Sequence, residues 1–191
     1  MAEALLKAWG APATVAAVEI DAAAKHVVRA ENTTVTDFKA GSRVVWTEKD
    51  GALPLPVNLN DKVLALAVDS SDFTEALDQE PLRVVGLTAA LYALKIDGER
   101  IGDFTKQELA QGINLALEPT PMIKQAWGVC DLIDKHNDLH FKRRLLEMKQ
   151  DDKIGSTPMT VDSLDRMEED VVRQLRAAAQ PQPRHYELNP H

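Results

Sequence analysis

The sequence predicts an α+β fold, in which an antiparallel β-sandwich-like domain is flanked by a short N-terminal helix and two C-terminal helices. Two observations lead to this class. Across residues 14–104 apolar side chains recur with a period of two, which is typical of strands that bury one face. After Thr105 the period changes to 3.6, which is typical of amphipathic helices. Short strands separated by turn residues favour two packed antiparallel sheets with about six to eight strands.

The expected strands follow one another closely along this region. They cover residues 15–20, 27–28, 33–38, 44–47, 63–68, 82–87, 91–96 and 99–104. Two dipeptides, Asp50-Gly51 and Asp97-Gly98, are strong hairpin signals, because such residues tolerate the positive φ of tight turns. Pro54 and Pro56 assign the segment between them to an edge or a loop.

A short helix is expected over residues 1–9, with Leu5, Leu6 and Trp9 on one side and Gly10 as its stop. No Ser, Thr, Asp or Asn precedes its first turn, so it lacks a side-chain N-cap. A helix of about two turns is marginal on its own. It is interpreted either as a terminal helix packed on the domain or as the end of a longer helix that begins upstream of Met1.

Two capping patterns mark the helices after the strands. Thr105 and Glu108 form a capping box, and Thr120 followed by Pro121 starts the longest helix. The chain is accordingly divided into six segments. They are a helix tail at 1–12, the β-sandwich-like domain at 13–104, a helical segment at 105–150, a linker at 151–160, an amphipathic helix at 161–180 and an extended tail at 181–191.

Composition excludes several classes of protein. The formal charge of -8 argues against a nucleic-acid binder, which needs a basic face. No apolar run approaches the roughly 20 residues of a membrane-spanning helix. Cys130 is the single cysteine, which excludes an internal disulfide and a cysteine-based zinc cluster. No secretory signal is present, and a signal further upstream would leave open a secreted or periplasmic protein, so localisation stays unknown.

One polar cluster on the longest helix invites a metal interpretation. It consists of Asp131, Asp134, His136, Asp138 and His140. The two histidines are four residues apart and therefore share a helix face. The pattern lacks the glutamate of a metalloprotease box, because position 137 is Asn. A solvated helix face is the favoured interpretation, and no metal or cofactor is predicted.

The remaining candidates are weaker. Cys130 lies among apolar residues, which is typical of an inert buried thiol. His26 lies in a strand with no carboxylate at a fixed offset. Neither a glycine-rich phosphate loop nor a Gly-x-Ser-x-Gly elbow is present. No catalytic residue is therefore assigned, and the substrate-binding residues remain unknown.

Several short stretches together resemble the C-terminal part of bacterial SGNH/GDSL-type esterases, in the long form where a β-rich segment follows the hydrolase fold. The stretches are residues 1–12, 72–79, 92–98, 112–116, 119–122, 136–141 and 176–188. The resemblance implies an ester hydrolase with a Ser nucleophile, a His base and oxyanion-hole donors. The Gly-Asp-Ser and Asp-x-x-His-Pro blocks of that family are absent, so its catalytic residues transfer to no position in this chain.

Two functions follow as expectations. The first is a non-catalytic accessory region whose partner is an upstream SGNH catalytic domain. The alternative is a β-sandwich module that binds carbohydrate or protein, with Trp9, Trp46 and Trp127 as candidate platforms, although core burial is expected for all three. We further expect Leu5, Leu6 and Trp9 to form an exposed apolar patch that drives self-association, or else to pack against Leu145.

Overall fold

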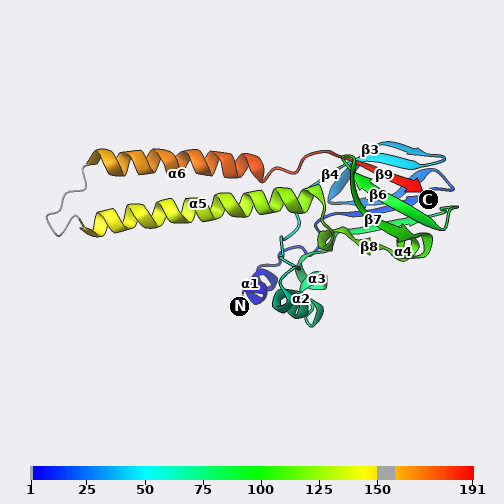
Figure 1. The fold of residues 1–191 in the computed structure, drawn as a ribbon, viewed down its shortest axis with the longest axis horizontal. Helices are drawn as coiled ribbons and strands as arrows, with labels where there is room; N and C mark the ends of the chain where they lie inside the picture. The colour runs from blue at the N-terminus through cyan, green and yellow to red at the C-terminus, as the bar shows by residue number, and fades with distance from the viewer. Residues whose placement is uncertain (1, 150–157) are drawn as a thin grey trace. The chain divides into compact units, whose positions relative to one another are not determined.

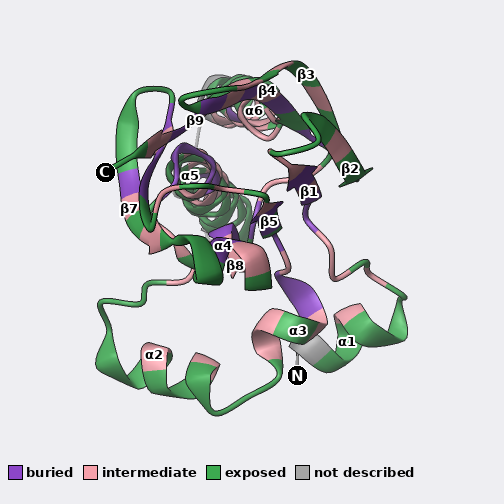
Figure 2. Cartoon of the chain, turned by 90° about the vertical axis from the view of Figure 1, so that its right-hand side faces the viewer, coloured by how far each residue is buried: buried purple, intermediate pink, exposed green. Residues whose placement is uncertain are grey.

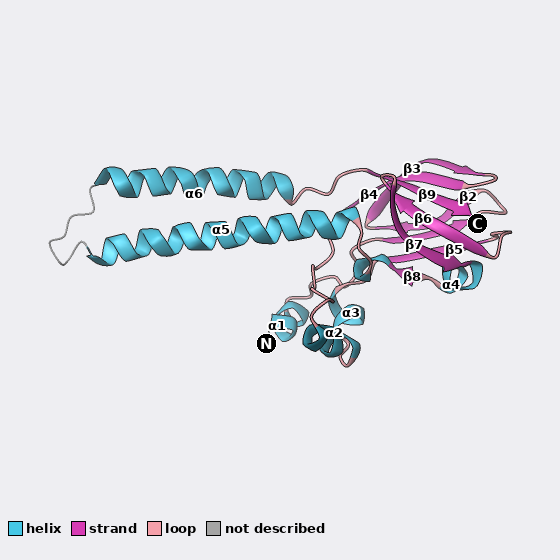
Figure 3. Ribbon diagram, viewed as in Figure 1, coloured by secondary structure: helices cyan, strands magenta, loops and turns pink. Residues whose placement is uncertain are grey.

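The computed structural model of the chain describes residues 2–149 and 158–191. It divides into two compact units. The first unit comprises Met1–Lys124 together with Pro181–His191, and the second comprises Gln125–Gln180. The first unit contains every strand of the described residues, and Figure 3 shows strands and helices in separate colours.

Two β-sheets form the first unit (Figure 1). The four-stranded sheet has the order β2 (His26–Glu31), β1 (Ala17–Asp21), β5 (Pro81–Val85) and β8 (Ile113–Asn114). The five-stranded sheet has the order β3 (Thr33–Ala40), β4 (Val44–Asp50), β9 (Arg184–Pro190), β6 (Leu91–Ile96) and β7 (Glu99–Thr105).

The buried faces of the two sheets share one hydrophobic core. Ile20 and Val84 come from the four-stranded sheet, and Trp46, Leu94 and Leu188 come from the five-stranded sheet. Figure 2 shows the buried positions on the strands of both sheets. The predicted α+β class, with two packed sheets and flanking helices, is confirmed. One departure is that β1 pairs with β5 in parallel, whereas the expected sheets were antiparallel throughout.

The segment expected to be an extended tail at 181–191 supplies a central strand. β9 pairs antiparallel with β4 on one side and with β6 on the other. Tyr186 and Leu188 alternate with exposed or half-buried neighbours and are themselves completely buried. Tyr186 and Leu188 therefore alternate with their neighbours as residues of a core strand do. This strand belongs to the first unit, although the 56 residues of the second unit separate it in sequence from the rest of the first unit.

Both caps predicted from the sequence are confirmed in the structure. The first unit contains several small helices. They are α1 (Ala2–Ala8), α2 (Lys62–Asp69), α3 (Phe73–Leu77), α4 (Lys106–Gln111) and the 3-10 turn η1 (Leu115–Leu117). The capping box of α4 is complete, because the Thr105 hydroxyl and the Glu108 carboxylate each accept a backbone N–H. The Thr120 hydroxyl likewise accepts the N–H of Ile123 at the start of the longest helix.

The strand expected at 63–68 is wrong, because these residues form the helix α2. Asp61 is its N-cap, and its carboxylate accepts the N–H groups of Val63 and Leu64. Leu and Ala are strong helix formers, and an N-cap ahead of them outweighs the apolar run that suggested a buried strand. None of the α2 residues is buried.

One of the two expected hairpin turns is wrong. Asp97 and Gly98 both have positive φ and join β6 to β7 as predicted. Asp50 instead ends β4, and the chain leaves the sheet afterwards. Gly51 donates its N–H to the carbonyl of Asn32, and a Cβ at Gly51 would lie 2.2 Å from the Asn32 side chain. Glycine is therefore needed at 51 for this close contact and not for a hairpin.

The second unit is a hairpin of two long helices, α5 (Pro121–Lys149, from Gln125 onward in this unit) and α6 (Pro158–Ala178). They run antiparallel, since Gln125 donates to the carbonyl of Ala178 and Arg143 pairs with Asp165. The linker was expected at 151–160; residues 151–157 lie outside the described residues, and the last three expected linker residues already belong to α6, which begins at Pro158. Neither helix, nor any other in the described ranges, has the length and apolarity needed to cross a membrane.

Candidate functional site

The two histidines singled out from the sequence face α6. His136 Nε2 lies 3.1 Å and His140 Nδ1 lies 3.2 Å from the same oxygen of Glu168. The two rings are stacked, with centroids 6.4 Å apart. Across residues 2–149 and 158–191, no group of three or more His, Cys, Asp or Glu side chains is arranged to hold a metal ion. Hydrogen bonding between helices accounts for this pair.

The three aspartates of the same cluster stay away from the histidine contact. Asp131, Asp134 and Asp138 are exposed. Asp138 pairs with Lys142 one helical turn later, at 2.5 Å. These carboxylates therefore form the solvated helix face that the sequence analysis favoured.

A charged groove of about 560 Å³ runs along the helical hairpin. Its lining residues are His136, Arg143, Asp165, Glu168, Glu169, Val172, Arg173 and Arg176. Arg143 pairs with both Asp165 and Glu147, and Arg173 pairs with Asp170. Because these arginines are already engaged by carboxylates, the groove offers little uncompensated charge to an anionic ligand.

The tryptophans do not all behave as expected. Trp46 is fully buried and stacks on Tyr186 with a centroid distance of 5.0 Å. Core burial, expected for all three, is wrong for Trp9, which is 73% exposed, and for Trp127, which is 39% exposed. Apolar spacing on a helix does not say which face is covered, and these two rings lie on uncovered faces.

Four carboxyl groups lie buried in the first unit, where the sequence analysis named no site. We call Glu48, Asp50, Asp78 and Glu80 the acidic cluster; all are almost completely inaccessible. Glu48 Oε2 accepts the indole N–H of Trp46 at 2.9 Å, and Asp78 Oδ1 accepts the N–H of Leu55 at 2.9 Å. Both oxygens of Glu80 lack a hydrogen-bond partner among the described residues.

Burial raises the pKa of every member of the acidic cluster. The pKa of Glu48 rises to about 8, through desolvation first and repulsion by Asp50 second. The pKa of Asp78 rises to about 6 through desolvation. Desolvation also places the pKa of Glu80 well above its ordinary value, and the carboxylates of Asp50, Glu48 and Asp78 add to the rise. With a pKa of about 8, Glu48 is mostly protonated at neutral pH.

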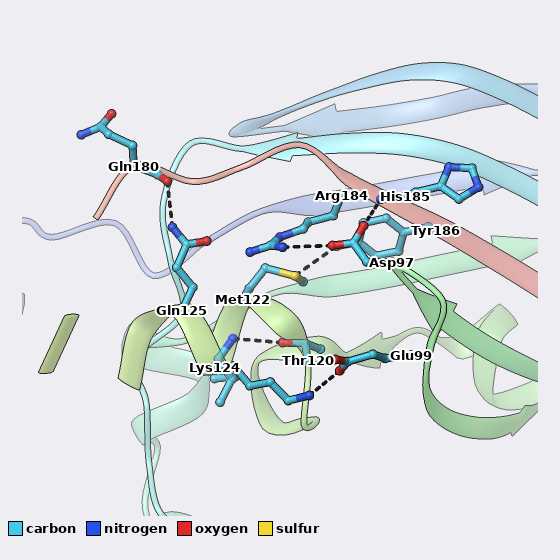
Figure 4. A network of polar contacts seen from close by, with 11 residues as sticks. Asp97, Glu99, Thr120, Met122, Lys124, Gln125, Gln180, Arg184, His185 and Tyr186 are labelled. Atoms are coloured by element: carbon cyan, nitrogen blue, oxygen red, sulfur yellow. Dashed lines mark hydrogen bonds and ion pairs between the residues drawn. The ribbon is translucent and has the colours of Figure 1, made fainter. Parts of the chain in front are cut away.

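A hydroxyl and a cation oppose the rise in pKa at one end of the cluster. The guanidinium of Arg184 and a hydrogen bond from Thr33 lower the pKa of Asp50, against the larger effect of burial. Arg184 also donates to Asp97 at 2.9 Å, and the same carboxylate accepts the N–H of His185 at 2.8 Å (Figure 4). The start of β9 is thus fixed on the β6–β7 turn beside the acidic cluster.

The sequence contains a signal for half of this cluster. Period-two alternation from Val44 and Trp46 places Glu48 and Asp50 on the same, buried face of β4. The prediction ended the strand at Thr47, because a hairpin turn was expected at Asp50-Gly51. Asp78 and Glu80 lie before β5, where no periodicity signals their burial.

A second feature is the exposed apolar surface of two small helices. Leu5 and Trp9 belong to or follow α1, and Val63, Leu64 and Leu66 belong to α2; all five are exposed. We call them the apolar helix residues. The exposure predicted for Leu5, Leu6 and Trp9 is confirmed for Leu5 and Trp9, whereas Leu6 is half-buried. Within the first unit α1 contacts α3, and Lys7 pairs with Asp72 at 2.7 Å.

The first unit also has a small pocket among loops at one end of the sheets. It has a volume of about 210 Å³, and Lys25, Arg43, Gly86 and Tyr92 are among its lining residues. Ligand pockets generally enclose about 300 Å³ or more. The pocket is therefore small for an organic ligand.

Comparison with known proteins supports the fold. No protein-family model and no curated protein matches the chain. A solved structure that is similar is described as a gut microbial diltiazem-metabolizing enzyme, with a TM-score of 0.81 and 24% sequence identity. The match covers 98% of this chain and 52% of that one, so the chain spans about half the length of the enzyme. At this level of identity the likeness defines a class of fold, an α+β sandwich with helical additions.

Proposed function

We propose that this chain is the C-terminal accessory region of an SGNH/GDSL-like ester hydrolase and is not catalytic by itself. The resemblance of its short motifs to that family supports this function, as does the occurrence of the same fold as about half of a larger enzyme. The chain lacks the Gly-Asp-Ser and Asp-x-x-His-Pro blocks. In an ester hydrolase these supply the nucleophile and the base.

The observation that carries the proposal is the exposure of the apolar helix residues. Val63, Leu66 and Trp9 are each exposed by 65% or more of their surface. Val63 and Leu66 lie one turn apart on α2, and adjoining exposed apolar side chains are typical of a protein interface. The occupant we propose is the hydrolase domain that precedes this region in the intact enzyme, with α1 and α2 as its docking surface.

In this function the chain supports the hydrolase domain structurally and transfers no proton to or from the substrate. The histidines of the helical hairpin are engaged by Glu168, and the carboxyl groups of the acidic cluster are buried. Glu48 holds a proton at neutral pH, yet its carboxyl is buried against Trp46 and Asp50. A general acid must reach its substrate within hydrogen-bond distance, so a sealed carboxyl does not fill that role.

A binding experiment tests the docking surface. The segment encoded in frame upstream would be expressed separately and titrated with this chain by calorimetry. Saturable binding is expected for the natural chain and loss of at least tenfold in affinity for Val63→Glu/Leu66→Glu. Val28→Glu is the matched control, since Val28 is also an exposed valine but lies on β2. An upstream reading frame without a Gly-Asp-Ser block, or binding unaffected by the α2 changes, contradicts the proposal.

The alternative is a β-sandwich module that binds carbohydrate. Its best candidate platform, Trp46, is fully buried, and its indole N–H is used by Glu48. The exposed rings of Trp9 and Trp127 belong to helical regions. This function therefore has less support than the accessory region.

A further inference from the structure

The face of α5 that does not contact α6 carries an exposed apolar stripe. The α6-facing side is fixed by the contacts of Gln125, His136 and Arg143. An α-helix turns by about 100° per residue, which fixes the position of each residue around its axis. On the side of α5 away from α6, a separate stripe of residues lies within an arc of roughly 60°. It consists of the apolar residues Trp127, Cys130, Phe141, Leu145 and Met148 and of the exposed carboxylate Asp134; Cys130 is half-buried.

Large side chains in this stripe are open to solvent. Phe141 is 60% exposed and Met148 is 65% exposed, while Trp127 and Leu145 are each exposed by 39%. On α6 Met167 is the large apolar side chain that is exposed among the described residues. Among the residues whose exposure the structure describes, the unpartnered apolar surface of the second unit is therefore concentrated on α5.

The sequence separations between successive stripe residues read the same from the first residue, Trp127, as from the last, Met148. Its members are separated by three, four, seven, four and three residues. A second copy running antiparallel therefore aligns Trp127 with Met148, Cys130 with Leu145 and Asp134 with Phe141. A two-fold axis between residues 137 and 138 generates all of these pairs, which is the self-complementarity that a symmetric dimer needs.

The charges beside the stripe favour the same arrangement. Asp131, Lys135, Asp138 and Lys142 are exposed along one flank, with spacings of four, three and four residues and alternating sign. Antiparallel pairing brings Asp131 opposite Lys142, and Lys135 opposite Asp138, to within about 3 Å along the helix axis. In a parallel pair the same flank of the two copies lies on opposite sides of the seam, so these four charges do not meet and this complementarity is absent.

We propose that the exposed face of α5 is a dimerisation surface whose partner is the antiparallel α5 of a second copy of this chain. The dimer has a two-fold axis at residues 137–138, and its seam is made by the stripe, with Asp134 of each copy beside Phe141 of the other. It does not depend on the ester-hydrolase proposal, because the surface lies on the helical hairpin and not on α1 or α2.

Cysteine cross-linking tests the register. In Leu145→Cys, the new thiol lies opposite Cys130 of the second copy, so mild oxidation of the full chain is expected to give a disulfide-linked dimer. Within one chain the two thiols are 15 residues apart, about 22 Å along a helix. The natural chain is expected to stay unlinked, because its two Cys130 residues are equally far apart. Met167→Cys on α6 is the matched control and is expected to stay unlinked.

Analytical ultracentrifugation tests the association itself. The natural chain is expected to sediment as a dimer at tens of micromolar, and Phe141→Glu/Leu145→Glu to weaken the dimer at least tenfold. Met167→Glu should leave it unchanged, and circular dichroism should show equal helix content in all three. A monomer at every concentration, or a Leu145→Cys chain that oxidises no faster than Met167→Cys, overturns the proposal.

Discussion

The indole N–H of Trp46 donates a hydrogen bond of 2.9 Å to the carboxyl of Glu48, two residues further along the same strand. Both side chains point into the core between the sheets, because residues i and i+2 of a strand share a face. An acid at such a position is unfavourable when ionised, and burial raises the pKa of Glu48 to about 8. Ionisation of this side chain is thereby linked to unfolding.

The first prediction concerns stability as a function of pH. Between pH 4.5 and 8 the folded chain holds a proton on Glu48, whereas the unfolded chain has released it. The free energy of unfolding therefore falls as pH rises through this window, by at most about 1.4 kcal/mol per pH unit from this group. Glu48→Gln keeps an acceptor for Trp46 and removes the ionisation. Urea unfolding at several pH values should show a flatter pH profile for this variant.

Asp103→Asn is a suitable control for the pH profile. This carboxylate is exposed on β7 and has a lowered pKa, because Arg100 hydrogen-bonds to it. It should leave the decline between pH 4.5 and 8 in place. An equal decline in the natural chain and in Glu48→Gln would show that Glu48 is not the group responsible.

The second prediction concerns Glu80, whose two carboxyl oxygens lack hydrogen-bond partners in the described structure. A buried polar group without a partner costs about 1–3 kcal/mol. Glu80→Met has a similar volume and no such group, so it is expected to raise the free energy of unfolding by that order. Thermal and urea denaturation at pH 7 measure it. A less stable Glu80→Met would mean that Glu80 has a stabilising partner.

The third prediction concerns β9. Leu188 is fully buried in the five-stranded sheet, and truncation of such a leucine costs about 2–5 kcal/mol. Leu188→Ala should therefore lower the free energy of unfolding by that amount. Glu187→Ala, on the neighbouring residue, removes a surface ion pair with Arg43 and should cost less than about 1 kcal/mol. Equal effects of the two changes would argue against a central position for β9.

The fourth prediction concerns the exposed N-terminal helix. Leu5→Glu/Trp9→Glu changes side chains that are already in water, so the free energy of unfolding should change by no more than about 0.5 kcal/mol. Binding of a hydrophobic dye should fall, and light scattering should detect less self-association through this surface. Lys7→Glu on the same helix is a control for added charge. An unfolded double variant would show that Leu5 and Trp9 belong to a core.

Strands were predictable where alternating apolar residues and the turn residues beside them both indicated a strand. Residues 91–104 form the hairpin expected from Asp97-Gly98. The apolar run at 63–68 lacked a local feature that separates a buried strand from a helix, apart from the N-cap Asp61. Its exposure was not predictable, because hydrophobicity ordinarily signals burial.

The acidic cluster was not predictable as a whole, because burial of a carboxyl depends on which chain segments cover it. Glu48 and Asp50 continue the alternation of β4, whereas Glu80 is buried by tertiary structure alone. The position of β9 was missed for a similar reason. Its partners β4 and β6 are more than 85 residues away along the chain, and local sequence does not encode such pairings.

The hydrolysis of p-nitrophenyl acetate by the isolated chain tests most directly the claim that it is a non-catalytic part of an ester hydrolase. The account predicts a rate equal to that of an inert protein of the same concentration, unchanged by substitution of any serine. Joining the upstream segment should produce saturable hydrolysis. Saturable turnover by the isolated chain, abolished by a single Ser→Ala substitution within it, would contradict the account.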